Sequence, residues 1–246
     1  MNRWRWTSTW AVALWLGLSS PGLGLQLSEL RDLTRLKLRD TTSDSNFQKF
    51  TDARILTLLN EAQRQIVNQT WLLSGTTTFG LVSGTAEYPM PDDFLAPLRV
   101  TISNKALEET TYQGLDADRT DWTTRSSTPT AYYITGYSNS LLPTQMGFVA
   151  KPSTNSVNSV TVFYAKRAAD LVSDTDVPFG GKKIFLSYHD LLTDCAAGMG
   201  WLIQGRADLA GGYFTICGSR SEQLKRNNGM MPNYNPSLRG ERPNNR

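Results

Sequence analysis

The sequence predicts an α+β fold: a helical bundle with an inserted antiparallel β-sandwich or barrel-like domain, followed by an extended C-terminal arm. Three observations predict it. Apolar residues recur with helical spacing near both ends of the chain, short runs rich in Thr, Val, Ile, Tyr and Phe fill the middle, and Asn and Pro are frequent in the last residues. The predicted parts are a signal-like segment or arm over 1–26, a helical hairpin over 27–74, the β-domain over 75–178, C-terminal helices over 179–226 and the arm over 227–246.

The first helix is predicted from leucines that recur every three residues between charged side chains. They are Leu27, Leu30, Leu33 and Leu36. This spacing indicates a single apolar stripe on a helix that ends near residue 40.

A second helix is predicted to begin after Thr51, because threonine caps helix N-termini well. Its apolar side chains should pack against the leucine stripe of the first helix, with Leu59 and Ile66 buried. The short connection between the two helices is typical of a helical hairpin.

Strands are predicted where β-branched and aromatic residues alternate with Gly, Pro and Asn. The expected strands cover residues 76–82, 86–88, 98–103, 105–108, 131–135, 147–150 and 159–165. One helical turn is expected over 116–122. From residue 182 the helical spacing returns, and a long buried helix should be followed by a second helix over 206–226. The small residues at 196–200 should let another backbone approach closely.

The two cysteines, Cys195 and Cys217, fit no zinc spacing. In the reducing cytosol they should be free, buried thiols, whereas oxidising surroundings would allow a disulfide. The net charge of +3 is mild. It predicts only weak, non-specific contact with nucleic acid.

The N-terminal segment supports two interpretations. Arg3, Arg5, the apolar run over 10–18 and the small residues that follow are typical of a secretory signal. Tryptophans could instead anchor an arm on a neighbouring subunit, and the candidates are Trp4, Trp6, Trp10 and Trp15.

Candidate catalytic and metal-binding groups lack the partners that their chemistry needs. His189 and Asp190 lack a positioned nucleophile, and Ser187 is too close in sequence to face His189 on a helix. The acidic pairs Asp116/Asp118 and Asp174/Asp176 lack the regular oxygen-ligand loop of calcium sites, so turn and cap roles are expected. The sequence therefore predicts neither an enzyme nor a cofactor, metal or small-molecule substrate.

Five segments in chain order resemble the head–tail adaptor (connector) proteins of tailed phages. They are residues 50–63, the Tyr-Pro-Met-Pro-Asp-Asp-Phe-Leu stretch at 88–95, Trp122 with Pro129, Tyr132 and Tyr133, the Phe-Val-Ala-Lys-Pro stretch at 148–152, and residues 160–178. Together they place the resemblance over residues 27–226.

The resemblance implies a structural virion protein at the neck, assembled in the host cytoplasm. Family members form a homo-oligomeric ring of about twelve copies through heterologous contacts. Such a ring lies between the portal protein and a tail or nozzle protein, and double-stranded DNA passes through its channel. A mild charge suits this role, because strong phosphate contacts would hold the DNA in place.

The C-terminal arm has too few apolar side chains for a core of its own. It nevertheless carries residue types that anchor interfaces, so we expect it to bind the portal. The candidate portal-binding residues are Tyr234, Pro236, Leu238, Arg239, Arg242 and Arg246.

Two alternatives remain open at this point. The signal-like start favours a secreted or periplasmic β-rich binding protein, and an exported hydrolase is a further possibility for which no site is visible. The mass of the mature chain and its oligomeric state would separate these from an adaptor.

Overall fold

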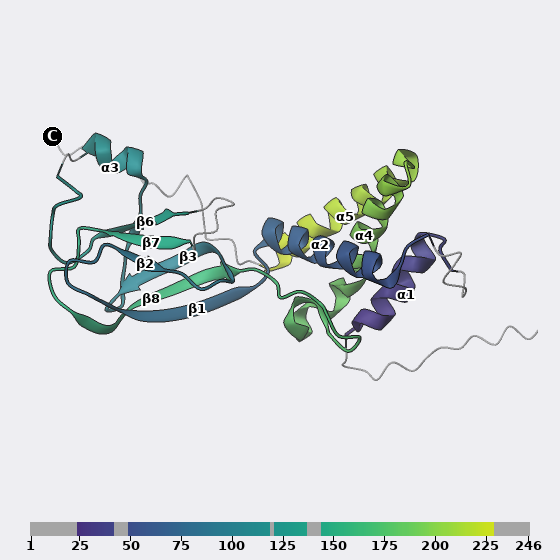
Figure 1. Cartoon of the computed structure of the whole chain (residues 1–246), viewed down its shortest axis with the longest axis horizontal. Coiled ribbons are helices and arrows are strands. Elements are labelled where there is room, and N and C mark those ends of the chain that lie inside the picture. Colours follow the sequence, from purple (N-terminus) through teal and green to yellow (C-terminus); the bar gives the residue numbers. More distant parts are fainter. Residues whose placement is uncertain (1–23, 42–48, 119–120, 137–143, 229–246) are drawn as a thin grey trace, which may run out of the picture.

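The computed structural model describes residues 24–41, 49–118, 121–136 and 144–228, and it mixes helices and strands as predicted. Helices α1, α2, α4 and α5 occupy one end of the molecule, and the two sheets with α3 occupy the other (Figure 1). The predicted domain boundaries remain predictions, but each end has its own apolar core.

Five α-helices and two short 3-10 helices are present among the described residues. They are α1 (Leu27–Lys37), α2 (Asp52–Thr70), α3 (Tyr112–Asp118), α4 (His189–Ile203), α5 (Ala207–Asn228), η1 (Pro178–Gly181) and η2 (Lys183–Tyr188). The predicted cap of α2 is confirmed, since Thr51 Oγ1 accepts a hydrogen bond from the backbone N–H of Arg54 at 3.2 Å. The helix predicted from residue 182 begins later, because a 3-10 segment precedes α4.

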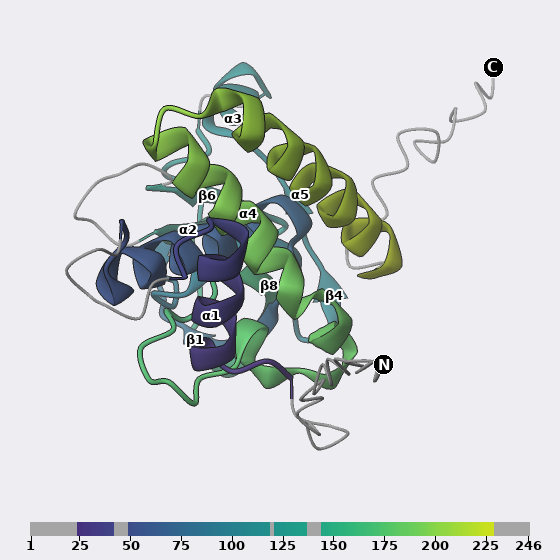
Figure 2. The same cartoon turned by 90° about the vertical axis from the view of Figure 1, so that its right-hand side faces the viewer.

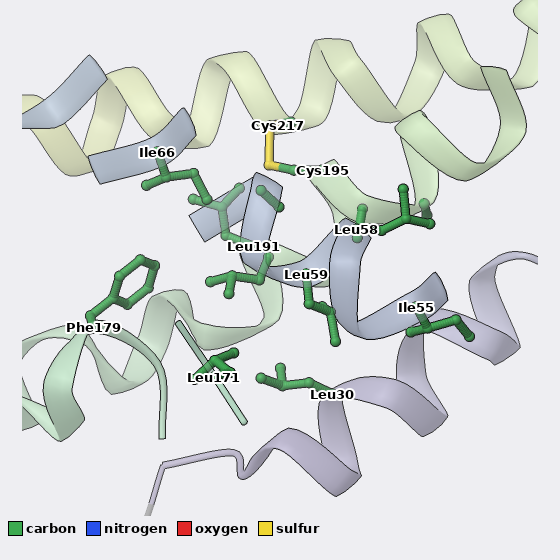
Figure 3. Packing of buried hydrophobic residues seen from close by; sticks show 14 of the residues in the cluster. Leu30, Ile55, Leu58, Leu59, Ile66, Leu171, Phe179, Leu191, Cys195 and Cys217 are labelled. Atoms are coloured by element: carbon green, nitrogen blue, oxygen red, sulfur yellow. A yellow bond between two sulfur atoms is a disulfide. The ribbon is translucent and has the colours of Figure 1, made fainter. Parts of the chain in front are cut away.

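The helical core gathers side chains from α1, α2, α4 and α5. Leu59 and Ile66 of α2 are fully buried, as predicted, and so is Leu30 of α1 (Figure 3). Helix α1 contacts both α2 and α4, and α5 lies along α4 (Figure 2).

The predicted stripe on α1 is only partly right. Leu27 and Leu30 are buried, but Leu36 is 63% exposed, and Thr34 and Leu38 are buried instead. At 3.6 residues per turn, each step of three residues falls about 60° short of a full turn. A strict three-residue repeat therefore rotates away from the core, while positions 27, 30, 34 and 38 stay on one face.

The glycines of α4 accept side chains rather than another backbone. A Cβ on Gly198 would lie 2.9 Å from the Phe214 ring, and one on Gly200 would lie 2.7 Å from Leu38 Cδ2. The expected close approach is present, but the neighbours are a ring and a methyl group.

The strands form two four-stranded sheets, with strand orders β1-β8-β3-β4 and β2-β7-β6-β5. Their bounds are β1 (Ser74–Leu81), β2 (Glu87–Pro89), β3 (Phe94–Ile102), β4 (Lys105–Ala106), β5 (Glu108–Glu109), β6 (Ala131–Thr135), β7 (Gln145–Val149) and β8 (Ser156–Lys166). The strand predicted over 131–135 is confirmed to the residue. The strand predicted over 105–108 is split into β4 and β5, which lie in different sheets, and the other predicted strands differ at their ends.

The sheets do not close into a barrel, so the barrel-like alternative is wrong. Residues from both sheets share one apolar core, with Phe148 of β7 and Val160 of β8 among its buried members. The antiparallel prediction also has an exception, because the two-residue β5 pairs with β6 in parallel.

The chain crosses between helices and sheets twice, and hydrogen bonds from α2 hold the returning segment. The Asn60 amide donates to Leu171 O at 3.0 Å and accepts from Leu171 N at 2.8 Å. The Gln63 amide donates to Ala169 O at 2.8 Å and accepts from Phe179 N at 2.9 Å. Both amides are buried. Asn60 satisfies the N–H and C=O groups of Leu171, and Gln63 satisfies the C=O group of Ala169 and the N–H group of Phe179.

The prediction of free thiols is wrong, because Cys195 and Cys217 form a disulfide between α4 and α5 (Figure 3). Their Cα atoms lie 5.2 Å apart, which is within the range that a disulfide requires. The prediction relied on the redox state of the cytosol. It did not consider that two adjacent helices bring both side chains into the same core.

Reducing this disulfide should lower the free energy of unfolding by about 3 kcal/mol, because the bond closes a loop with a separation of 22 residues in the unfolded chain. Urea unfolding with and without reductant measures the effect. A variant with both cysteines replaced by alanine should not respond to reductant. Free thiols in denatured, unreduced protein would contradict the prediction.

Candidate interaction surfaces

The residues predicted to bind the portal and those predicted to anchor an N-terminal arm lie outside the described residues. They are Tyr234, Pro236, Leu238, Arg239, Arg242 and Arg246 in the first set, and Trp4, Trp6, Trp10 and Trp15 in the second. Both sets stay predictions.

An ion network joins α1, α4 and α5. Arg220 of α5 donates two hydrogen bonds of 2.8 Å to Asp190 and one of 3.2 Å to Asp194. Lys37 of α1 binds Asp194 from the other side and donates to Thr193 Oγ1 at 2.7 Å. The network thus fixes three helices that come from both ends of the sequence.

The charge of Arg220 controls the ionisation of Asp190. Burial alone would raise the pKa of Asp190, but the hydrogen bond and charge of Arg220 outweigh it, and the pKa lies below its ordinary value. A lowered carboxyl pKa contributes stability near neutral pH and loses it as the pH falls through the folded-state pKa. The network is therefore fully formed at neutral pH.

Exposed large apolar side chains are present at both ends of the molecule. On the helical end, Leu202 and Ile203 at the end of α4 are 56% and 51% exposed. On the sheets, Val82 and Val157 are 53% and 88% exposed, each next to the Leu81–Ser156 pair where β1 ends and β8 begins. Adjacent exposed apolar side chains are candidate contacts with other chains, more so than isolated ones.

A cleft of about 680 Å³ lies where α2 approaches the ends of β3 and β8. Its charged lining is balanced, since Arg64 pairs with Asp170 at 3.3 Å and Lys166 approaches Asp93 at 4.0 Å. The remaining lining residues are Asn68, Asp92, Leu95, Arg167, Ala168 and Ala169. Because these charges are paired, the cleft has no strong preference for an anion or a cation as a ligand.

An aromatic cluster attaches α3 to the second sheet. Tyr112 lies 4.9 Å from Tyr133 between ring centroids, and Trp122 lies 5.7 Å from each. Both tyrosine hydroxyls donate to Glu87 at 3.3 Å, and burial together with this carboxylate raises the pKa of Tyr133. These contacts hold α3 against the sheet, and the three rings also line a pocket of about 200 Å³.

His189 is fully buried and packs against Phe179, with ring centroids 6.0 Å apart. Burial lowers its pKa, which favours the neutral imidazole. A Cβ on Gly24 would lie 2.2 Å from His189 Cε1, so the chain entering α1 rests directly on this ring. These contacts give His189 a structural role in the helical core.

Of the acidic pairs, Asp116, Asp174 and Asp176 act in turns and ion pairs. Asp176 accepts hydrogen bonds from the N–H groups of Val172 and Ser173 at 2.7 and 2.8 Å. Asp174 pairs with Arg31 at 2.6 Å, and Asp116 accepts from the Trp122 indole at 2.8 Å. Within the described ranges, no cluster of His, Cys, Asp and Glu could hold a metal ion.

Sequence reasoning missed three groups that the structure brings together: the disulfide, the ion network and the Asn60/Gln63 amides. The spacing of Asp190 and Asp194 by four residues places both on one helix face, which was a usable signal for the network.

No helix among the described residues is long and apolar enough to cross a membrane.

The comparisons with known proteins point to one family. Residues 25–222 match the family described as SU10 adaptor protein, and no curated protein matches the chain. The matched region contains every described helix and strand up to the last turn of α5. Because this match spans most of the sequence, the chain belongs to the SU10 adaptor protein family.

Proposed function

We propose that this protein forms a ring between the portal and the tail of a phage virion, and that DNA passes through the ring. The observation that carries the proposal is the family match over residues 25–222. Membership supports a structural role without catalysis at the virion neck, in contact with other head and tail proteins. It favours the adaptor over the secreted binding protein and the exported hydrolase.

The structure supplies contacts suited to such a ring. Exposed apolar side chains on both the helices and the sheets would let one copy contact neighbours through two different surfaces, as heterologous ring contacts require. About twelve copies, assembled in the host cytoplasm, would enclose the channel. The net charge of +3 per chain permits transient, non-specific contact with double-stranded DNA.

Each part of the chain would have its own role in the assembly. Residues 27–74 and 179–226 would form the helical unit, whose ion network and disulfide hold it rigid. Residues 75–178 would form an inserted β-domain with its own core. The arm over 227–246 would reach the portal.

The disulfide is compatible with this role. Disulfides persist at virion surfaces, where reducing enzymes of the cytosol no longer act. The bond can therefore belong to the mature particle even when the chain is made in the cytoplasm.

Deleting residues 229–246, the part of the predicted arm that lies beyond α5, should abolish attachment of the protein to DNA-filled heads and leave its melting temperature nearly unchanged. Tyr234, Leu238 and Arg239 are the residue types that anchor interfaces, whereas the arm has too little apolar area to stabilise the fold. The occupancy of heads is measured by electron microscopy and quantitative gel analysis, and the melting temperature by calorimetry.

The matched control replaces Asn244 and Asn245 by serine, which should leave occupancy nearly unchanged because neither residue is a candidate portal contact. Binding of the full chain should also weaken as salt rises, because the arginines would pair with carboxylates of the portal. Normal occupancy with the arm-less chain would show that the arm does not bind the portal. Failure of the full chain to join heads at all would contradict the proposed function itself.

A further inference from the structure

Strand β1 forms one edge of its sheet, and within the described ranges no strand lies on its outer side. It pairs only with β8, over residues Ser74 to Leu81. An eight-residue edge of this kind presents a row of unpaired backbone groups to other chains.

The pairing with β8 identifies which backbone groups face outward. Lys166 donates its N–H to Leu73 O at 2.9 Å, which makes these two residues a hydrogen-bonded pair in the antiparallel ladder. Such pairs alternate with non-hydrogen-bonded ones along the strands. Ser74, Thr76 and Thr78 therefore point their N–H and C=O groups away from β8, and both threonine side chains are exposed.

The other sheet edges carry the features that prevent pairing with further chains. Strand β2 has three residues including Glu87 and Pro89, β5 consists of two glutamates, and β4 has two residues including Lys105. Strand β4 covers only the end of β3. The uncovered part of β3 contains Pro97, and its pairing with β8 shifts in register on both sides of this proline. Strand β1 has no charge, no proline and no bulge before Phe79, so it is the unprotected edge among the described strands.

We infer that the outer edge of β1 binds an extended strand from a second copy of this chain, and that residues 6–16 are this strand. The inference rests on the proposed assembly of several copies. Residues 6–16 form an eleven-residue stretch without charge, Gly or Pro, and they contain Trp, Thr and Val, which favour strands. Added strands of this kind bind through main-chain hydrogen bonds, and an uncharged partner suits an uncharged edge.

The other terminal segment fits this edge poorly. The C-terminal arm is interrupted by Pro232, Pro236 and Pro243, and proline cannot donate to a ladder. Residues 6–16 are also long enough to pair with all eight residues of β1. The seven residues 17–23 that precede Gly24 extend over about 25 Å at most, which gives the strand reach toward a neighbour.

Hydrogen exchange at the Thr76 and Thr78 amides tests the inference directly. In assembled full-length protein these amides should exchange at least tenfold more slowly than in dilute, monomeric protein. Deleting residues 1–23 should abolish this protection, while deleting residues 229–246 should leave it. Rapid exchange in the assembled full chain would overturn the inference, and undiminished protection after deletion of 1–23 would overturn the assignment of the strand.

Substitutions at the same two positions provide a second test. The double variant Thr76→Pro, Thr78→Pro removes two outward N–H groups and no bond to β8, and it should weaken assembly at least tenfold in analytical ultracentrifugation. The control Thr76→Val, Thr78→Val keeps these N–H groups and should assemble normally. Where circular dichroism shows that the proline variant does not fold, Thr76→Lys, Thr78→Lys replaces it. Normal assembly of the folded variant would overturn the inference.

The experiments distinguish failure of the strand exchange from failure of the proposed adaptor role. Full-length protein that joins heads with fast-exchanging β1 amides would refute the strand exchange and leave the adaptor role intact. Full-length protein that does not join heads would refute the adaptor role, whatever β1 does.

Discussion

Replacing Leu59 by alanine should lower the free energy of unfolding by about 2–5 kcal/mol, as for other large-to-small changes in a core. Leu59 is fully buried in the middle of α2, between Leu30 of α1 and Leu191 of α4 (Figure 3). Truncation removes apolar contacts with two helices at once and leaves a cavity that rigid neighbours cannot fill. Urea unfolding monitored by circular dichroism measures the loss.

The matched control is Leu36→Ala on α1. Leu36 is 63% exposed, so the same truncation should change stability by no more than about 0.5 kcal/mol. This control also checks the direction of the α1 face. Equal losses for both variants would mean that the α1 stripe faces the core throughout, and a negligible loss for Leu59→Ala would place that residue outside the core.

Replacing Asn60 by alanine should cost about 2–6 kcal/mol, because it leaves two buried backbone groups of Leu171 without partners at about 1–3 kcal/mol each. The amide of Asn60 supplies both the donor and the acceptor that these groups need. The loss should appear as a lower denaturant midpoint with an unchanged slope, because the folded architecture is otherwise the same.

Asn68→Ala is the control for this prediction. Asn68 lies on the same helix and is exposed in the cleft, so its loss should stay within about 0.5 kcal/mol. If Asn60→Ala behaves like the control, water replaces the amide and the segment over 167–177 is held by other contacts.

Local patterns predicted much of the fold. Thr51 gave the start of α2 because N-capping depends on a few adjacent residues, and β6 follows directly from a run of β-formers. The order of helices, strands and helices was also predictable from the changing spacing of apolar residues. The family resemblance was supported by segments whose order along the chain is retained.

Features that depend on distant residues were not predictable from local patterns. The disulfide requires α4 and α5 to lie side by side, and the contacts of Asn60 join residues 111 positions apart. The two separate sheets likewise result from crossovers that strand propensity does not encode. The predicted portal-binding and anchoring residues remain untested, because they lie outside the described residues.

The paired amide contacts of α2 have a mechanical consequence. The segment over 167–177 runs back from β8 to the helices. Asn60 holds it through one donor and one acceptor at Leu171, and Gln63 holds it through one donor at Ala169 and accepts from Phe179 just beyond it. Pulling the sheets away from the helices would have to break several of these hydrogen bonds, so the junction should resist separation more than a single contact would.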